Sequence, residues 1–212
     1  MLLKNIVQTN NGNIEIYVNL RKRHRNNNFF YSLLDMTFTS KSSTNATLQL
    51  AIPNHWEGII KNEWNNTYHT EDIPIAEIGT RNSCLNLDSR SSIYDQNCSL
   101  TKIVLPNTLE VINPTSLSHL MGIKKIGKIV FPYNADYSKK TLKIKDYAFE
   151  GICLQNKKII FPEYKQINFQ KFAFANLNEI YIPQKTKLHC VKSNADALTK
   201  CKSSDHALIV RY

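Results

Sequence analysis

The second half of the chain repeats one short phrase, three apolar residues followed by a proline. The four copies are Ile103-Val104-Leu105-Pro106, Ile129-Val130-Phe131-Pro132, Ile159-Ile160-Phe161-Pro162 and Ile180-Tyr181-Ile182-Pro183. Their prolines stand 26, 30 and 21 residues apart. A phrase that returns at such intervals is typical of a solenoid, in which stacked units bury a face that no single unit can cover.

Counting back from each proline aligns the four copies in columns. The third residue back is always isoleucine, and the residue directly before the proline is always large and apolar. Since strand side chains alternate between two faces, these columns predict the inward side of a short strand. The proline ends that strand because it has no N–H for the ladder. The sixth residue back is apolar in three copies and is Asn156 in the other.

A second apolar cluster follows each of the first three prolines, at residues 112–117, 144–149 and 169–174. We expect each cluster to return the chain across the core in a turn or short helix. The predicted fold is therefore a β-rich α+β solenoid of short parallel strands. The middle unit is longer than its neighbours around residues 136–140, which predicts a loop that bulges from one face and could take part in binding.

The repeats divide the chain into four predicted parts. Residues 1–45 form a lead-in or cap, and residues 46–97 form divergent repeats or a cap. Residues 47–53 look like a degenerate copy of the phrase, because Leu50 and Ile52 lead into Pro53. Residues 98–183 hold the clear repeats, and residues 184–212 form a C-terminal cap.

The repeat phrase resembles the BspA-type, or Treponema pallidum-type, leucine-rich repeat family. The family unit runs roughly Cys-x-x-Leu-x-x-Ile-x-Ile-Pro-x-x-Leu-x-x-Ile-x-x-x-Ala-Phe. Residues 98–112 and 146–151 match it best, and Ser116-Leu117 stands where Ala-Phe is usual. The resemblance covers residues 98–212 and extends loosely back to 47.

The resemblance implies a leucine-rich repeat module that binds other proteins. It also implies a helix at 193–200, a closing strand at 207–212, and core positions for Cys98 and Cys153. Members of the family are commonly surface or secreted proteins that resemble adhesion modules. The localisation of this chain stays open, because its first seven residues are too short and too soon polar for a convincing secretory signal. No stretch approaches the roughly 20 apolar residues that span a bilayer.

The net charge of +10 lies entirely in residues 100–212, which hold 18 Lys and Arg against 8 Asp and Glu. Such asymmetry indicates either an anionic partner or a lysine-rich solvated surface. The lysines form a column of their own, because the fourth residue before each proline is Lys102, Lys128, Lys158 and then Glu179. If the isoleucines point inward, this column points outward.

An apolar column borders the lysines on the same outward face. We define the binding strip as these two columns together: Lys102, Lys128, Lys158, Val104, Val130, Ile160 and Tyr181. One interpretation is a surface for an acidic protein or another anion. The alternative is that the lysines only keep the sheet edge soluble and prevent aggregation.

The remaining sequence patterns indicate function less specifically. The basic run Arg21-Lys22-Arg23-His24-Arg25 could bind nucleic acid, but a solvated loop is favoured. Cys190 and Cys201 could pair in an oxidising compartment, although reduced thiols are the default. No catalytic motif, metal-ligand spacing or cofactor site is predicted. An enzyme using Glu57 or Glu63 within residues 54–96 is the least favoured hypothesis.

We therefore expect a non-catalytic module whose strand face binds a protein partner. An acidic glycan or another polyanion is the alternative, and nucleic acid is less favoured because Tyr181 is the only aromatic residue expected beside the lysines.

Overall fold

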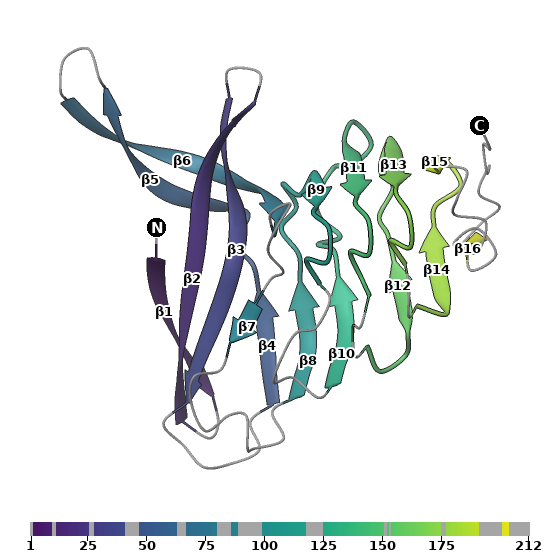
Figure 1. Ribbon diagram of the computed structural model, residues 1–212, viewed down its shortest axis with the longest axis horizontal. Helices are drawn as coiled ribbons and strands as arrows, with labels where there is room; N and C mark the ends of the chain where they lie inside the picture. Colours follow the sequence, from purple (N-terminus) through teal and green to yellow (C-terminus); the bar gives the residue numbers. More distant parts are fainter. Residues whose placement is uncertain are drawn as a thin grey trace.

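The computed structural model describes residues 2–9, 12–25, 28–40, 47–62, 67–79, 86–88, 99–117, 125–150, 152, 154–174, 177–190 and 201–203. Within these ranges every regular element is a β-strand. Figure 1 shows long N-terminal strands at one end of the molecule and two rows of short strands that run from there toward the C-terminus. None of the described elements is a helix long and apolar enough to cross a membrane.

The N-terminal strands are long and mostly antiparallel. They are β1 (Leu2–Thr9), β2 (Gly12–Arg25), β3 (Asn28–Ser40), β5 (His55–Asn62), β6 (Thr67–Ile78) and the short β7 (Asn86–Asp88). β1, β2 and β3 pair antiparallel in chain order, as do β5 and β6, whereas β3 runs parallel to both β6 and β7. Through β6 this sheet continues into the repeats, because β6 pairs in parallel with β9 (Val111–Ile112).

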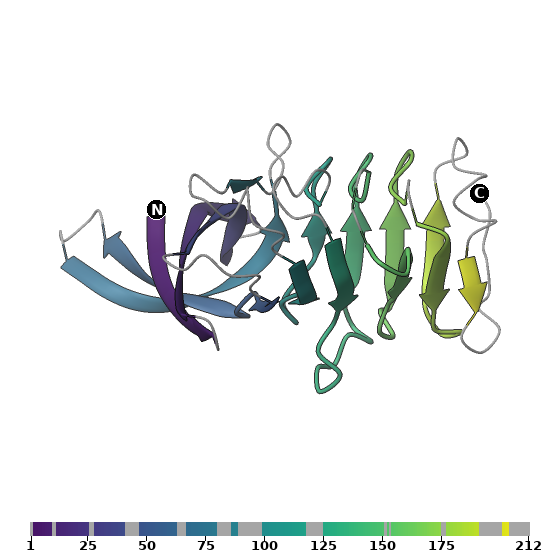
Figure 2. The same cartoon turned by 90° about the horizontal axis from the view of Figure 1, so that it is seen from below.

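The repeat half is a parallel β-solenoid with two rows of strands. The upper row consists of β9, β11 (Thr141–Ile144), β13 (Gln166–Phe169) and β15 (Lys187–Cys190). The lower row consists of β4 (Thr47–Ala51), β8 (Ser99–Val104), β10 (Lys125–Val130), β12 (Lys158–Ile160), β14 (Glu179–Ile182) and β16 (Cys201–Ser203). Figure 2 shows these strands following one another along the molecule. The predicted solenoid is confirmed.

The α+β assignment is wrong for the described residues. The second apolar clusters contribute to β9, β11 and β13 and to the turns after them, so they build a second parallel sheet where turns or short helices were expected. The strand is favoured because Ile112, Ile144 and Phe169 each lie opposite a neighbour in register. Each repeat contributes one short strand to each sheet. The backbone N–H and C=O groups of that strand pair with those of the strands stacked beside it. The helix predicted at 193–200 and the strand predicted at 207–212 lie outside the described residues.

The core follows the columns counted from the prolines. The isoleucine column and the column before proline are all buried: Ile103, Ile129, Ile159, Ile180, Leu105, Phe131, Phe161 and Ile182. β4 also joins the stack, since Leu50 lies opposite Ile103 in the register of β4 with β8. Asn156 leaves the core column and is exposed. Leu154 takes its place, because it is buried and bridges to Ile126.

The Ala-Phe turn is equally regular. Ser116 and Leu117 occupy the same positions as Ala148-Phe149 and Ala173-Phe174, and all six side chains are buried. The buried Ser116 hydroxyl is satisfied by hydrogen bonds to the carbonyl oxygens of Ile78 at 2.9 Å and Asn113 at 2.6 Å. A serine can therefore replace the usual alanine there without leaving an unpaired polar group.

The extra residues of the longer middle unit also contribute a side chain to the core. Tyr137 points back into the core, where its ring centroid lies 4.8 Å from that of Tyr164 and 6.3 Å from that of Phe131. Asp136 fixes the turn, because its carboxylate accepts hydrogen bonds from the Ser138 amide and hydroxyl. These bonds lower the pKa of Asp136. Within the loop predicted at 136–140, Asp136 and Ser138 are exposed, whereas Tyr137 is buried.

Candidate functional site

The predicted lysine column lies on the outer face of the lower row. Lys102 of β8 stands directly opposite Lys128 of β10 in the parallel register. Lys158 of β12 stands opposite Glu179 of β14. Lys128 is exposed, and Lys102 and Lys158 are partly exposed. Neighbouring strands lie about 4.8 Å apart, so the Lys102 and Lys128 side chains leave the sheet close enough for their positive charges to repel each other.

The apolar column lies two residues further along the same strands. Val104 is opposite Val130, and Ile160 is opposite Tyr181. Ile160 is 50% exposed, and the other three side chains are partly exposed. Each lysine of the binding strip is therefore followed, two positions on, by an apolar side chain on the same face.

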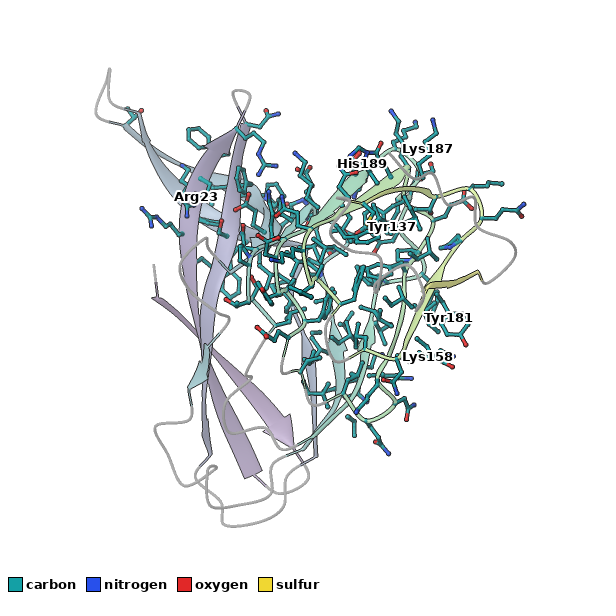
Figure 3. The ribbon with its side chains drawn as sticks, turned by 45° about the vertical axis from the view of Figure 1, so that its right-hand side comes forward. Arg23, Tyr137, Lys158, Tyr181, Lys187 and His189 are labelled. Atoms are coloured by element: carbon teal, nitrogen blue, oxygen red, sulfur yellow. The ribbon has the colours of Figure 1, made fainter. Side chains whose placement is uncertain are left out.

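Lys158 and Tyr181 form one contact unit within the binding strip. The Lys158 ammonium lies 4.0 Å from the centroid of the Tyr181 ring, which is the geometry of a cation–π interaction. The Tyr181 hydroxyl donates a hydrogen bond of 3.0 Å to Glu179 Oε2. Figure 3 shows Lys158 and Tyr181 on one side of the molecule and Lys187 and His189 on the opposite side, with Tyr137 between them. Glu179 thus holds the Tyr181 ring where Lys158 covers it.

The lower row is divided between β10 and β12. β10, β8 and β4 form one three-stranded sheet, and β12, β14 and β16 form another. The two are joined at the start of β10, where the Gln155 amide donates to the Ile126 carbonyl oxygen at 2.7 Å. Lys157 then adopts a left-handed conformation with φ 46°, and β12 pairs with β14 on its far side. Along the rest of β10 the structure describes no ladder with β12.

A groove follows this division and coincides with the middle of the binding strip. It has a volume of about 370 Å³. Its lining includes Lys102, Lys128, Lys158, Val130, Ile160 and Tyr133. Among the described residues that line the groove, none is acidic. Of the predicted strip, Val104 and Tyr181 lie beside the groove and not in its lining.

Tyr133 is the residue of this site that the sequence columns missed. It directly follows Pro132 and is 90% exposed, the most exposed of the large hydrophobic side chains described. The signal was its place after the proline, where the other copies carry Asn107, Glu163 and Gln184. Tyr133 therefore adds an exposed aromatic ring to the lining of the groove.

Gly127 sets the close approach of β8 and β10 beneath the groove. A Cβ atom at this position would collide with the Thr101 carbonyl oxygen and would lie 3.0 Å from the carbonyl carbon. Both are backbone atoms, which a side-chain rotation cannot move aside. The absence of a side chain at Gly127 therefore keeps the Lys102–Lys128 pair in register.

The basic run 21–25 belongs to β2 and not to a solvated loop, so that interpretation is wrong. Arg25 ion-pairs with Glu77 and, at 3.0 Å, with Glu110, and the Lys22 ammonium lies 4.0 Å from the Phe29 ring centroid. The run forms a strand because it pairs with the apolar start of β3, including the buried Phe30. Its charges are partly used in binding the N-terminal strands to the solenoid.

A second cavity, of about 750 Å³, lies beside this basic run. Its lining includes Arg25, Phe29, Asp72, Glu110 and Lys140. Arg25 and Glu110 already pair with each other, and Lys140 donates to the Asn107 carbonyl oxygen at 2.6 Å. This cavity is therefore a junction between the N-terminal strands and the first repeat, with much of its charge compensated.

The remaining candidates do not converge on a reactive centre. Glu57 of β5 is exposed opposite Asp72 of β6, and Glu63 lies outside the described residues. Cys98 and Cys153 also lie outside them, so their predicted core positions stay predictions. Cys190 is buried in β15, and burial raises the pKa of its thiol. Nowhere in the described ranges do three or more His, Cys, Asp or Glu side chains cluster as metal ligands would.

Comparison with known proteins found no match. No protein-family model, no curated protein and no solved structure matches this chain.

Proposed function

We propose that this protein is a non-catalytic repeat module that binds a protein partner through the binding strip on its lower row. The observation that supports this most strongly is the groove between β10 and β12. It combines three lysines with exposed apolar side chains and has no acidic residue among its described lining. Ile160 and Tyr133 are exposed there, although a surface needed only for solubility gains nothing from apolar groups.

The arrangement supports binding over catalysis because its charges all have one sign. General acid–base chemistry needs a donor and an acceptor with suitable pKa values near the reacting atoms. The groove instead offers ammonium groups and hydrocarbon, which suit an anionic and partly apolar surface. A family role in adhesion at a cell surface remains an expectation from the repeat resemblance alone.

A set of random peptides displayed on phage, selected against the full chain, would test the proposal. The test variant reverses three charges, Lys102→Glu, Lys128→Glu and Lys158→Glu. The matched control, Lys143→Glu, Lys165→Glu and Lys187→Glu, alters the net charge equally at three exposed lysines on or next to the upper row. Selected peptides should lose at least about tenfold in affinity, about 1.4 kcal/mol, only with the test variant. Equal affinity for both variants would remove the binding strip from the site.

Tyr133 supports a second candidate function, the binding of single-stranded nucleic acid. An exposed aromatic ring beside a row of lysines could stack on a base of single-stranded nucleic acid. Fluorescence anisotropy with a labelled random single strand separates the two candidates. Nanomolar binding that weakens steeply with salt would favour nucleic acid, whereas weak binding at physiological salt favours the protein partner.

A further inference from the structure

Charged and apolar side chains follow each other along the groove at a defined spacing. Lys128 and Val130 lie two residues apart on β10, and Lys158 and Ile160 lie two residues apart on β12. Residues two apart on a strand face the same side and are separated by about 6.6 Å. Both walls of the groove therefore present a positive charge at one level and an apolar side chain at the next.

The groove accepts side chains and not a whole strand. β10 and β12 are held together at their start by the bridge between Ile126 and Leu154. Inserting a strand between them would require about twice the usual spacing of about 4.8 Å. A ligand segment therefore lies over the outer side of the groove and places alternate side chains into it. The volume of about 370 Å³ is at the low end of the range for ligand pockets, so it suits a short segment.

Resting on the proposed function, we propose that the partner presents an extended peptide segment in which an acidic residue and an aliphatic residue stand two positions apart. The carboxylate meets Lys128 and Lys158, and the aliphatic side chain meets Val130 and Ile160. An extended peptide has the same two-residue period as the groove walls, so both contacts form at once.

The chemistry of the groove favours this peptide over nucleic acid. A nucleic-acid backbone carries an oxygen-rich sugar and no aliphatic side chain between its phosphates, so Val130 and the half-exposed Ile160 would lack a matching apolar group. A peptide carboxylate relieves the repulsion between Lys102 and Lys128, while its neighbour two residues on covers Ile160. Tyr133 lines the groove from the turn after β10, so it contacts the segment as well.

Two labelled synthetic peptides of the same composition test the spacing. One repeats Glu-Ser-Ile-Ser, which keeps glutamate and isoleucine two apart. The other repeats Glu-Ile-Ser-Ser, which places them side by side and sends them to opposite faces of an extended chain. Anisotropy with the full chain should give micromolar binding for the first peptide, at least about tenfold tighter than for the second. Equal binding of the two peptides would overturn the spacing.

Single substitutions locate the peptide. Ile160→Thr keeps strand propensity and should weaken the first peptide about tenfold, as should Lys128→Glu. Lys143→Glu on the upper row should leave binding unchanged, and far-ultraviolet circular dichroism should be the same for all three variants. Unchanged binding with both Ile160→Thr and Lys128→Glu would overturn the placement in the groove.

The proposed function can survive the failure of this inference. If neither synthetic peptide binds but phage-selected ligands still lose affinity with the triple reversal at Lys102, Lys128 and Lys158, the spacing is wrong and the binding strip stands. If the selected ligands bind both triple variants equally, both proposals fail. Displacement of the first peptide by single-stranded DNA at physiological salt, with tighter binding of the DNA, would overturn the peptide in favour of nucleic acid.

Discussion

Lys102 and Lys128 face each other across adjacent parallel strands, so two side chains of the same charge leave one sheet at neighbouring positions. Like charges directly opposite each other destabilise a sheet, typically by a few tenths of a kcal/mol to about 1 kcal/mol. The fold retains this repulsion where the groove opens. A pair that costs stability in the free protein is consistent with selection for a ligand of opposite charge.

Reversing one member of this pair should stabilise the free protein. Lys128→Glu replaces repulsion with attraction and is expected to raise the free energy of unfolding by about 0.5–1 kcal/mol at low salt. The gain should shrink at high salt, where the Debye length is only about 3 Å at 1 M. Urea unfolding at two salt concentrations measures this. Lys143→Glu is the control, because Lys143 stands opposite the neutral Asn168 and Val111. A salt-independent loss of stability in Lys128→Glu would contradict the repulsion.

Gly127→Ala should destabilise the solenoid although it adds only one methyl group. The new Cβ would meet the backbone of Thr101, so β8 and β10 must move apart. Overpacking of this kind costs about 1–3 kcal/mol. Lys128→Ala, at the adjacent exposed position, should stay within about 0.5 kcal/mol of the native protein. Thermal unfolding of the two variants compares them directly, and equal midpoints would show that the strands yield without cost.

The columns of the solenoid could be predicted because the prolines fix a common origin for counting. Ile103 and Ile129 are buried at the same position of successive strands, and the outward Lys102 and Lys128 follow from alternation. Counting fails where the chain changes register. Leu154, two residues before Asn156, occupies the core position that counting assigns to Asn156. The division between β10 and β12, which opens the groove, begins at Leu154.

Other features depend on contacts that no local pattern encodes. Tyr137 lies between Asp136 and Ser138 in a segment without a period, yet it is buried against Tyr164, 27 positions later in the printed sequence. The second sheet was missed because β9 is only two residues long, and pairing with its neighbours determines its conformation more than propensity does. For the same reason, the partners of Arg25 at Glu77 and Glu110 could not be inferred from the basic run.

The two ion pairs of Arg25 should differ in strength because their partners differ in burial. The Glu77 side chain is 12% exposed and also accepts a hydrogen bond of 2.8 Å from Ser32, whereas the Glu110 side chain is 50% exposed. Glu77→Gln should therefore lower the free energy of unfolding by about 1.5–3 kcal/mol, and Glu110→Gln by at most about 1 kcal/mol. Double-mutant cycles with Arg25→Gln measure each coupling. Equal couplings would mean that burial of Glu77 does not strengthen its pair.

Alkaline pH should unfold the protein through its buried tyrosines. Burial raises the pKa of Tyr137 to about 12, and burial together with Tyr137 and Glu110 raises the pKa of Tyr164 further. In the unfolded chain both phenols ionise near 10. Above that pH the folded state binds more protons than the unfolded state, so stability falls as pH rises, by up to about 1.4 kcal/mol per pH unit for each tyrosine. Urea midpoints measured from pH 8 to 11 would show the decline.

Tyr137→Phe separates the contribution of this one hydroxyl. The buried Tyr137 oxygen has no hydrogen-bond partner among the described residues, and an unsatisfied buried polar atom costs about 1–3 kcal/mol. Removing it should raise the free energy of unfolding near neutral pH by about 1 kcal/mol and make the alkaline decline shallower, leaving Tyr164 as the main source of the slope. Tyr133→Phe is the control, because Tyr133 is 90% exposed and should alter neither quantity. A loss of stability in Tyr137→Phe would show that the hydroxyl is hydrogen-bonded in solution and that the core at this repeat admits water.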